Sequence, residues 1–232
     1  MTHVTTTLRD AATTLVGVPV RAQTYRNLIY LALAFPLGLA YFVGLTVGFS
    51  LGVGLAFTWV GIPILLATLA VASALARVEA GLANCLLGTD VRAPSLDTSG
   101  GVLAATKRLV TDARTWVAVG YLLVKFGLGI VSFAALAALT SLSVGLVTAP
   151  LTYSSNYYVG LRLGNATVGP FESGRLVVDT FGEAVGVALL GLVVALASLH
   201  ALNALARLCG TITEEILDSS GAARTTGATD EN

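Results

Sequence analysis

A long stretch without charge constrains the fold of this chain most strongly. From Asn27 to Ala76 the sequence contains no Asp, Glu, Lys or Arg. A helix needs about 20 residues to cross the hydrocarbon core of a bilayer, so this stretch can hold two membrane spans joined by a short turn. Charged residues make up 11% of the chain, against about 25% in soluble domains, and the mean hydropathy is +0.83. We therefore expect an integral membrane protein.

The turn between these two spans has two candidate positions. One is the group Ser50, Gly52 and Gly54, and the other is Gly61-Ile62-Pro63. The first position leaves Arg77 just outside the membrane, whereas the second draws it inside. We favour the first because a charged side chain within the bilayer is costly.

Two further apolar segments predict a third span from about Val117 to Leu142 and a fourth from about Ala184 to Ala206. The expected fold class is all-α, an integral membrane four-helix protein. Residues 152–182 are polar and separate these two spans. Residues 77–115 are polar too, and within them Val102, Leu103, Leu109 and Val110 recur at helical spacing. They predict a short amphipathic helix, lying on the membrane surface or packed on the protein.

The distribution of Lys and Arg predicts the orientation. Most of them precede span one, lie between spans two and three, or follow span four, and only Arg162 and Arg175 lie in residues 152–182. Cytoplasmic loops are enriched in these residues, so both termini should be cytoplasmic in a multi-pass protein of the cell membrane. The expected organisation is a cytoplasmic N-terminal segment (1–21), a first transmembrane hairpin (22–87), a cytoplasmic linker with the amphipathic helix (88–112), a second transmembrane hairpin (113–209) with an outer loop (152–182), and a cytoplasmic, disordered tail (210–232).

The two hairpins resemble each other in sequence. Residues 22–42 match residues 113–133 at one constant offset, and residues 67–77 match 197–207 at a larger offset, which the outer loop explains. The identities fall on aromatic and glycine positions as well as on Leu and Ala, which indicates two tandem duplicated hairpins. The matched motif positions are Tyr30, Phe35 and Gly38 with Tyr121, Phe126 and Gly129, and Pro36 is replaced by Gly127.

Gly44, Gly48 and Gly52 form two successive GxxxG steps on the first span. Small residues at this spacing let a neighbouring helix approach closely, and we favour this packing role over that of making the helix pliable for signalling. Lys125 stands where the first repeat has Ala34. It is a candidate intramembrane functional residue, but a snorkelling side chain that reaches the headgroups is favoured.

His200, Asn203 and Arg207 share one face of the fourth span. Such a face can sense protons, but an interhelical hydrogen-bond seam is the favoured interpretation. Arg77 and Glu79, which follow the second span, are expected to be solvated charges at the membrane interface. Asn165-Ala166-Thr167 forms a glycosylation sequon in the outer loop, and this pattern is weak evidence because it often arises by chance.

No catalytic motif is present in the sequence. It lacks a P-loop, an HExxH and a GxSxG, so we expect no enzyme activity and no cofactor or metal. No CxxC or Cys/His cluster is present, which argues against a zinc site. Cys85 and Cys209 are expected to be free thiols, because both fall near predicted cytoplasmic helix ends, where a disulfide would be unusual. The net charge is zero, which gives no indication of nucleic-acid binding. The lipid bilayer is the expected partner, with a separate protein or a second copy of the chain.

Several longer motifs recur in the two halves of the chain. The first half carries TYRNLIYLALAFPLGLAYF, GVGLAFTWVGIPILL and ALARVEAGLANCLLG, and the second carries TWVAVGYLLVKFGLGIVSF, SVGLVTAPLTY and ALARLCG. Through these motifs, residues 20–217 resemble a sensor domain family of haloarchaeal and actinobacterial membrane signalling proteins, in its stand-alone form. The resemblance implies a non-enzymatic membrane sensor or signalling input module that acts through a separate partner protein. The alternatives are a small membrane transporter and an accessory subunit of a membrane complex.

Overall fold

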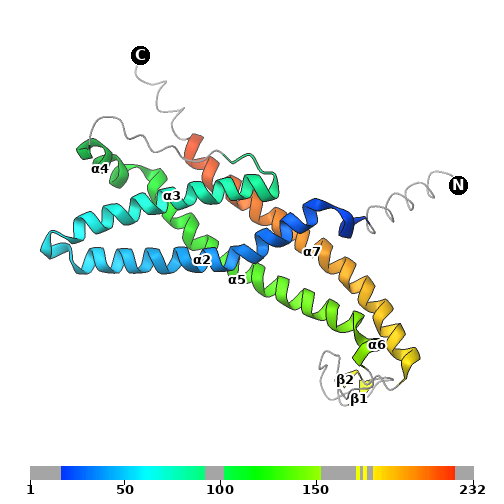
Figure 1. Ribbon diagram of the computed structural model, residues 1–232. Helices are drawn as coiled ribbons and strands as arrows, with labels where there is room; N and C mark the ends of the chain where they lie inside the picture. The colour runs from blue at the N-terminus through cyan, green and yellow to red at the C-terminus, as the bar shows by residue number, and fades with distance from the viewer. Residues whose placement is uncertain (1–16, 92–101, 153–170, 173–174, 177–179, 223–232) are drawn as a thin grey trace, which may run out of the picture. The chain divides into compact units, whose positions relative to one another are not determined.

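The computed structural model describes residues 17–91, 102–152, 171–172, 175–176 and 180–222 (Figure 1). Helices dominate these residues. They are the short 3-10 helices η1 (Val18–Val20) and η2 (Ala56–Thr58) and the α-helices α2 (Ala22–Gly54), α3 (Gly61–Leu87), α4 (Val102–Thr111), α5 (Ala113–Val147), α6 (Ala149–Thr152) and α7 (Phe181–Ala222). Two short strands, β1 (Phe171–Glu172) and β2 (Arg175–Leu176), pair antiparallel with Phe171 opposite Leu176.

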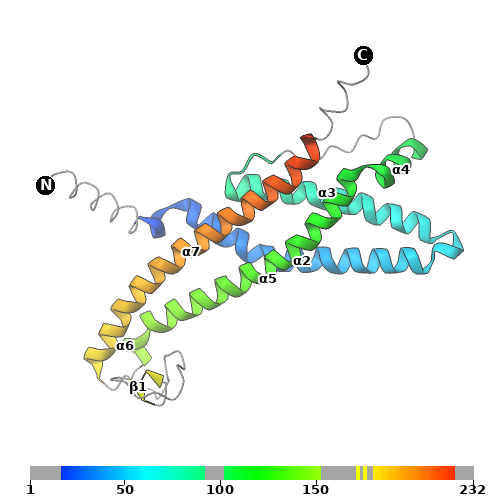
Figure 2. The ribbon, with the colours of Figure 1, turned by 180° about the vertical axis from the view of Figure 1, so that it is seen from behind.

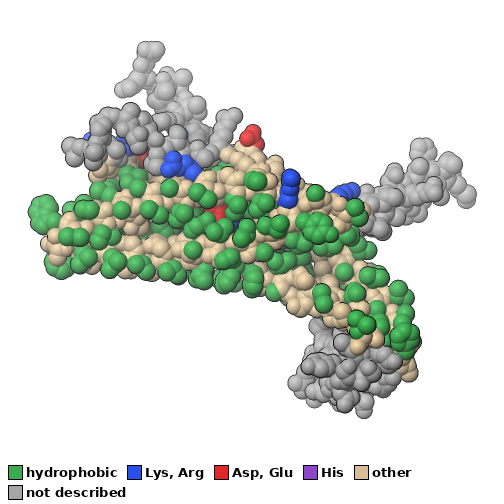
Figure 3. All heavy atoms as spheres, viewed as in Figure 1, with side chains coloured by type: hydrophobic (Ala, Val, Ile, Leu, Met, Phe, Trp, Pro, Cys, Tyr) green, Lys and Arg blue, Asp and Glu red, His purple; other side chains and the backbone are tan. Residues whose placement is uncertain are grey.

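Four of the helices are long and apolar enough to cross a membrane, namely α2, α3, α5 and the Phe181–Leu217 part of α7. The expected all-α fold with four membrane-spanning helices is therefore confirmed. At 1.5 Å per residue the 33 residues of α2 extend about 50 Å, which is more than the roughly 30 Å of a hydrocarbon core. Hydrophobic side chains lie along the exposed surfaces of these helices (Figure 3). In a bilayer these side chains contact lipid.

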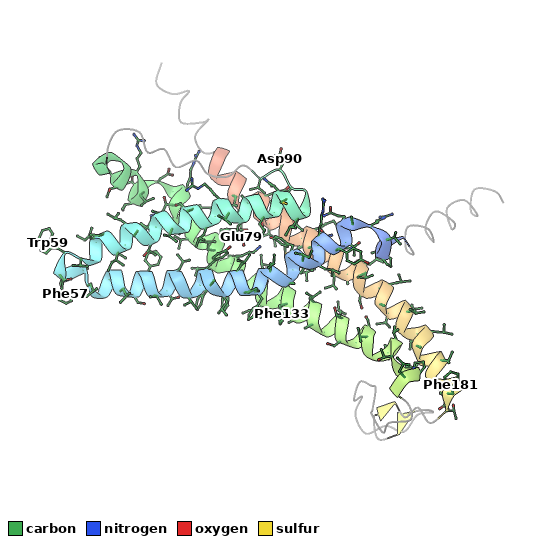
Figure 4. The ribbon with its side chains drawn as sticks, in the orientation of Figure 1. Phe57, Trp59, Glu79, Asp90, Phe133 and Phe181 are labelled. Carbon is green, nitrogen blue, oxygen red and sulfur yellow. The ribbon has the colours of Figure 1, made fainter. Side chains whose placement is uncertain are left out.

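The turn of the first hairpin lies between the two expected positions. Because α2 continues to Gly54 and α3 begins at Gly61, both glycine groups belong to helix ends and η2 makes the turn. A side chain at Gly61 would meet the backbone carbonyl of Gly52, which explains why glycine begins α3. Pro63 is tolerated in the first turn, where backbone N–H groups have no helical partner. Phe57 and Trp59 project from the tip of the hairpin (Figure 4).

The chain folds as two compact units. One contains residues 1–24 with 134–203, and the other contains residues 25–133 with 204–232. The second unit holds the main core, where α2 and α3 run side by side (Figures 1 and 2). Ala72, Ala76 and Ala80 form a fully buried stripe on α3, and these small side chains let neighbouring helices approach closely.

The segment after Gly210 differs from its expected disorder. Helix α7 continues to Ala222, because apolar side chains recur at helical spacing beyond Gly210. Leu217 is 2% exposed and belongs to the core, and Ile216 packs against that core. A polar segment is helical here because one of its faces is buried. Most of the outer loop, including the sequon at Asn165, lies outside the described residues.

Candidate functional site

Four buried side chains from three membrane-spanning helices form a polar cluster in the core of the second unit. Helix α2 contributes Tyr30 and Tyr41, α3 contributes Glu79, and α5 contributes Lys125. Each of them is at most 4% exposed. Ionisable groups are rarely buried in a membrane protein unless they are paired. We call these four residues the polar cluster.

An ion pair lies at the centre of the polar cluster. Lys125 Nζ is 2.8 Å from Glu79 Oε2, and it donates a hydrogen bond of 2.6 Å to the hydroxyl of Tyr30. The ammonium also lies 4.1 Å from the centroid of the Tyr30 ring, within the range of a cation–π interaction. A single side chain of α5 thus contacts both α2 and α3.

The second carboxylate oxygen of Glu79 is bound from α2. Tyr41 donates a hydrogen bond of 3.0 Å to Oε1. An isolated charge in this environment would be strongly unfavourable, whereas a pair with further hydrogen bonds offsets most of the desolvation. Removing one member of such a pair costs about 3–5 kcal/mol, because the other charge stays buried without a partner. The arrangement therefore links α2, α3 and α5 by one charged contact.

A second polar contact joins α5 to α7 in the same unit. The hydroxyls of Tyr121 and Thr213 lie 3.2 Å apart, and Thr213 also donates to the carbonyl of Cys209 one turn earlier on α7. Both side chains are 1% exposed. Ser132 Oγ lies 3.7 Å from Cys209 Sγ. Buried polar groups on α5 therefore have partners on α7 as well.

The helices α2 and α5 cross at two glycines. A Cβ added to Gly38 would lie 2.9 Å from Cα of Phe126, and a Cβ added to Gly129 would lie 2.5 Å from the carbonyl oxygen of Ala34. Only glycine permits this separation of the two backbones. Stacked rings lie at the same crossing, Phe35 with Phe133 at 5.2 Å and Phe42 with Phe126 at 4.5 Å between centroids.

Two expectations about charged residues are corrected. Lys125 is 2% exposed and ion-paired, so it does not snorkel toward the headgroups. Glu79 is 0% exposed and is not a solvated interfacial charge (Figure 4). A sequence signal for Glu79 exists, because it falls seven residues after Ala72 and three after Ala76, on the buried face of α3. Arg77 is only partly buried, and its Nε lies 3.4 Å from the carbonyl of Ser73 on the same helix.

The three residues of the expected face on α7 differ in their surroundings. Asn203 Nδ2 donates a hydrogen bond of 3.2 Å to Thr24 Oγ1 near the start of α2, as an interhelical seam requires. Nε2 of His200 is buried and has no hydrogen-bond partner among the described residues. Arg207 is exposed. The structure thus shows an interhelical hydrogen bond for Asn203 alone.

Of the three glycines spaced by four residues on α2, Gly48 and Gly52 pack closely against α3 and Gly44 does not. Added side chains at Gly48 and Gly52 would collide with Thr68 and Leu65 of α3, respectively, whereas one at Gly44 would meet nothing within 4 Å. Gly44 instead lines an open groove of about 260 Å³ between α2 and α3. Of the repeat-motif positions, Pro36 is exposed within α2.

No group of three His, Cys, Asp or Glu side chains comes together in the described part of the chain as a metal site would need. In that same part, Cys85 and Cys209 are free thiols, the first exposed and the second buried.

Comparison with known proteins identifies a family. A family model with the description "Putative sensor" matches residues 30–217. The matched range contains the polar cluster together with Tyr121 and Thr213. No curated protein and no solved structure matches the chain.

Proposed function

The chain belongs to the "Putative sensor" family, and on this premise we propose that it is a non-enzymatic membrane input module that detects a cue and passes it to a separate partner protein. The match covers most of the chain, including parts of all four membrane-spanning helices. A module of this kind needs helices that can change their packing and a contact that responds to the change.

The ion pair of Lys125 and Glu79 is the observation that carries the proposal. A sensor needs an element with two arrangements whose free energies differ by a few kcal/mol. Making or breaking a buried ion pair changes the free energy by an amount of that size. Lys125 Nζ lies 2.8 Å from Glu79 Oε2, so a small displacement of α5 would weaken the contacts of Lys125 to both Glu79 and Tyr30. A cue that moves α5 against α2 and α3 is thereby converted into loss or gain of one strong contact.

The contact between the hydroxyls of Tyr121 and Thr213 supports a path by which a movement at the polar cluster reaches α7. Tyr121 lies one turn before Lys125 on α5, and Thr213 lies near the C-terminal end of the Phe181–Leu217 segment of α7, which continues to Ala222. Movement of α5 therefore acts directly on this end of α7. With both termini cytoplasmic, as the Lys and Arg distribution favours, the end of α7 and the amphipathic α4 are the proposed contact points for the partner.

The proposal is tested in cells of the source organism. Deletion of the gene should alter the transcriptional response to at least one stress. Under that stress, Lys125→Gln and Glu79→Gln should each fix the output in one state, whereas Arg207→Gln, which removes an exposed charge, should respond as the native protein does. A deletion strain with unchanged responses to every stress contradicts the sensor role.

The partner is tested by mild cross-linking in native membranes and identification of the proteins that purify with the chain. A signalling protein cross-linked to α4 or to the end of α7 supports the proposal. Recovery of a transporter component in its place contradicts it and favours the accessory-subunit alternative.

A transporter is the second candidate, and the burial of Lys125 favours it specifically, since intramembrane ionisable residues mark substrate pathways in transporters. In the structure, the charge of Lys125 is balanced by Glu79 and bonded to Tyr30, which suits a structural switch equally. The two are distinguished by substrate flux into liposomes that contain the purified protein. Flux that disappears in Lys125→Gln and persists in Arg207→Gln supports transport.

A further inference from the structure

The aromatic contacts between α2 and α5 are reciprocal. In the sequence match of the two hairpins, Phe35 corresponds to Phe126 and Phe42 corresponds to Phe133. Exchanging the two hairpins therefore converts the stack of Phe35 on Phe133 into the stack of Phe126 on Phe42, which is the other stack that the structure contains. Such paired contacts are the mark of a twofold axis.

The glycine contacts obey the same exchange. A Cβ on Gly38 would meet the backbone of Lys125 and Phe126, and a Cβ on Gly129 would meet the backbone of Ala34 and Phe35. In the sequence match, Gly38 corresponds to Gly129 and Lys125 corresponds to Ala34. Each glycine thus packs against the same two aligned positions of the opposite hairpin.

The contacts of the second helix of each hairpin are also matched when the two hairpins are exchanged. At the offset that aligns residues 67–77 with 197–207, Glu79 corresponds to Cys209. Tyr41 corresponds to Ser132 at the offset of the first helices. The hydrogen bond from Tyr41 to Glu79 is therefore matched by the contact of Ser132 with Cys209 at 3.7 Å.

The hairpin turns provide a further match, one within each unit. A Cβ on Gly61 would meet Leu55 and Ala56, and a Cβ on its counterpart Gly191 would meet Leu146 and Val147. Leu146 and Val147 are the counterparts of Leu55 and Ala56 at the offset of the first helices.

From these contacts we infer that the polar cluster has an uncharged twin in the same unit, made by Ala34, Tyr121, Ser132 and Cys209 and related to it by an internal twofold axis. In this twin position Ala34 takes the place of Lys125, Tyr121 that of Tyr30, Ser132 that of Tyr41, and Cys209 that of Glu79. Ala34 and Cys209 are each 3% exposed, so the twin position is buried as the cluster is. The inference concerns the architecture and does not rest on the sensor role.

The partners of the two buried tyrosines explain why the twin position needs no charged residue. A buried phenol hydroxyl needs a hydrogen-bond partner. The hydroxyl of Tyr30 accepts a hydrogen bond from Lys125, and the hydroxyl of Tyr121 is paired with that of Thr213. Thr213 corresponds to Ala83 of the first hairpin, which has no hydroxyl. A threonine on α7 thus does for Tyr121 what the lysine on α5 does for Tyr30, without a second buried ion pair and its desolvation cost.

The inference is tested by moving the ion pair. The starting variant carries Lys125→Ala and Glu79→Cys, which give the polar cluster the side chains of the twin position. Ala34→Lys and Cys209→Glu are then added singly and together, and the thermal unfolding midpoint of each full-length variant is measured in lipid nanodiscs. Each single addition should lower the midpoint, because it buries one charge alone. The two together should raise it by several degrees above either single variant.

If the decrease in the midpoint of the combined variant equals the sum of the decreases in the two single variants, the inference is overturned. Positions 34 and 209 are then not paired as 125 and 79 are. A control pair, Ala34→Lys with Cys85→Glu, should show no recovery, because Cys85 is exposed.

A second measurement covers the case in which the relocated pair prevents folding. In a chain that carries Cys85→Ser, Cys209→Ser and a protease site within residues 92–101, one variant receives Phe35→Cys with Phe133→Cys and another receives Phe42→Cys with Phe126→Cys. A short bifunctional maleimide should hold the two protease fragments together in both variants to a similar extent. Cross-linking in only one of the two contradicts the twofold relation.

Discussion

Replacing Lys125 with Met tests the energetic role of the polar cluster most directly. Methionine keeps an unbranched chain of similar length but removes the ammonium, so it leaves Glu79, which is 0% exposed, without its cation. Breaking a buried pair in this way costs about 3–5 kcal/mol. Loss of a neutral interhelical hydrogen bond in a membrane averages only about 0.6 kcal/mol. The unpaired charge of Glu79 should therefore dominate the loss of stability. The size of the decrease in the free energy of unfolding distinguishes a broken ion pair from a lost neutral hydrogen bond.

The free energy of unfolding is measured by denaturant titration of the purified protein in mixed micelles. Arg207→Met is the matched control, because it also replaces a cation on a membrane helix but at an exposed position. It should change the free energy of unfolding little. A loss for Lys125→Met as small as that of Arg207→Met refutes the description of Lys125 as buried and paired.

The double variant Lys125→Met with Glu79→Gln completes the cycle. Removing both charges abolishes the unpaired carboxylate, and replacing a whole buried pair is often nearly neutral. The double variant should therefore be more stable than Lys125→Met alone by roughly 2 kcal/mol or more. If the two losses add, the two side chains do not interact.

Three further predictions concern other contacts. Gly129→Ala should destabilise the protein by about 1–3 kcal/mol in the same titration, because its Cβ meets the backbone of α2, whereas Gly127→Ala, which meets nothing within 4 Å, should be neutral or slightly stabilising; equal effects contradict the close crossing. Tyr41→Phe should cost about 0.5–2 kcal/mol, less than Lys125→Met, since the carboxylate keeps its cation; a larger loss than that of Lys125→Met assigns the main role to the hydroxyl. A membrane-permeant maleimide should modify Cys85 in the folded protein and reach Cys209 only after unfolding, as mass spectrometry of the two peptides checks; rapid modification of Cys209 contradicts its burial.

Much of the secondary structure was accessible from the pattern of apolar residues. The stretch from Asn27 to Ala76 has no charge and is long enough for two spans, and in the structure it forms most of α2 and α3. The helix ends were less accessible. The turn at residues 55–60 contains no proline and no glycine, and Gly54 and Gly61 flank it at the helix ends, so the sequence signals on either side of it pointed to the wrong positions.

The end of α7 shows a different limit of pattern analysis. The residues after Gly210 are polar enough to suggest disorder, but Thr213 and Leu217 lie on one helical face and are buried. Helical stability comes mostly from packing of such a face rather than from composition. The surface that receives this face belongs to other helices, so the composition of the segment alone could not reveal it.

Hydropathy and the length of apolar segments were enough to predict a membrane protein with four spans, because both are local properties of the sequence on which insertion into a bilayer depends. The sequence match also predicts which positions of the two hairpins correspond. The pairing of Lys125 with Glu79 is visible only in the folded chain, since the two residues lie on different helices and neither segment indicates which face meets the other. Whether a charge near a helix end is solvated or buried depends on the neighbours that cover it, and those neighbours are brought together only by folding.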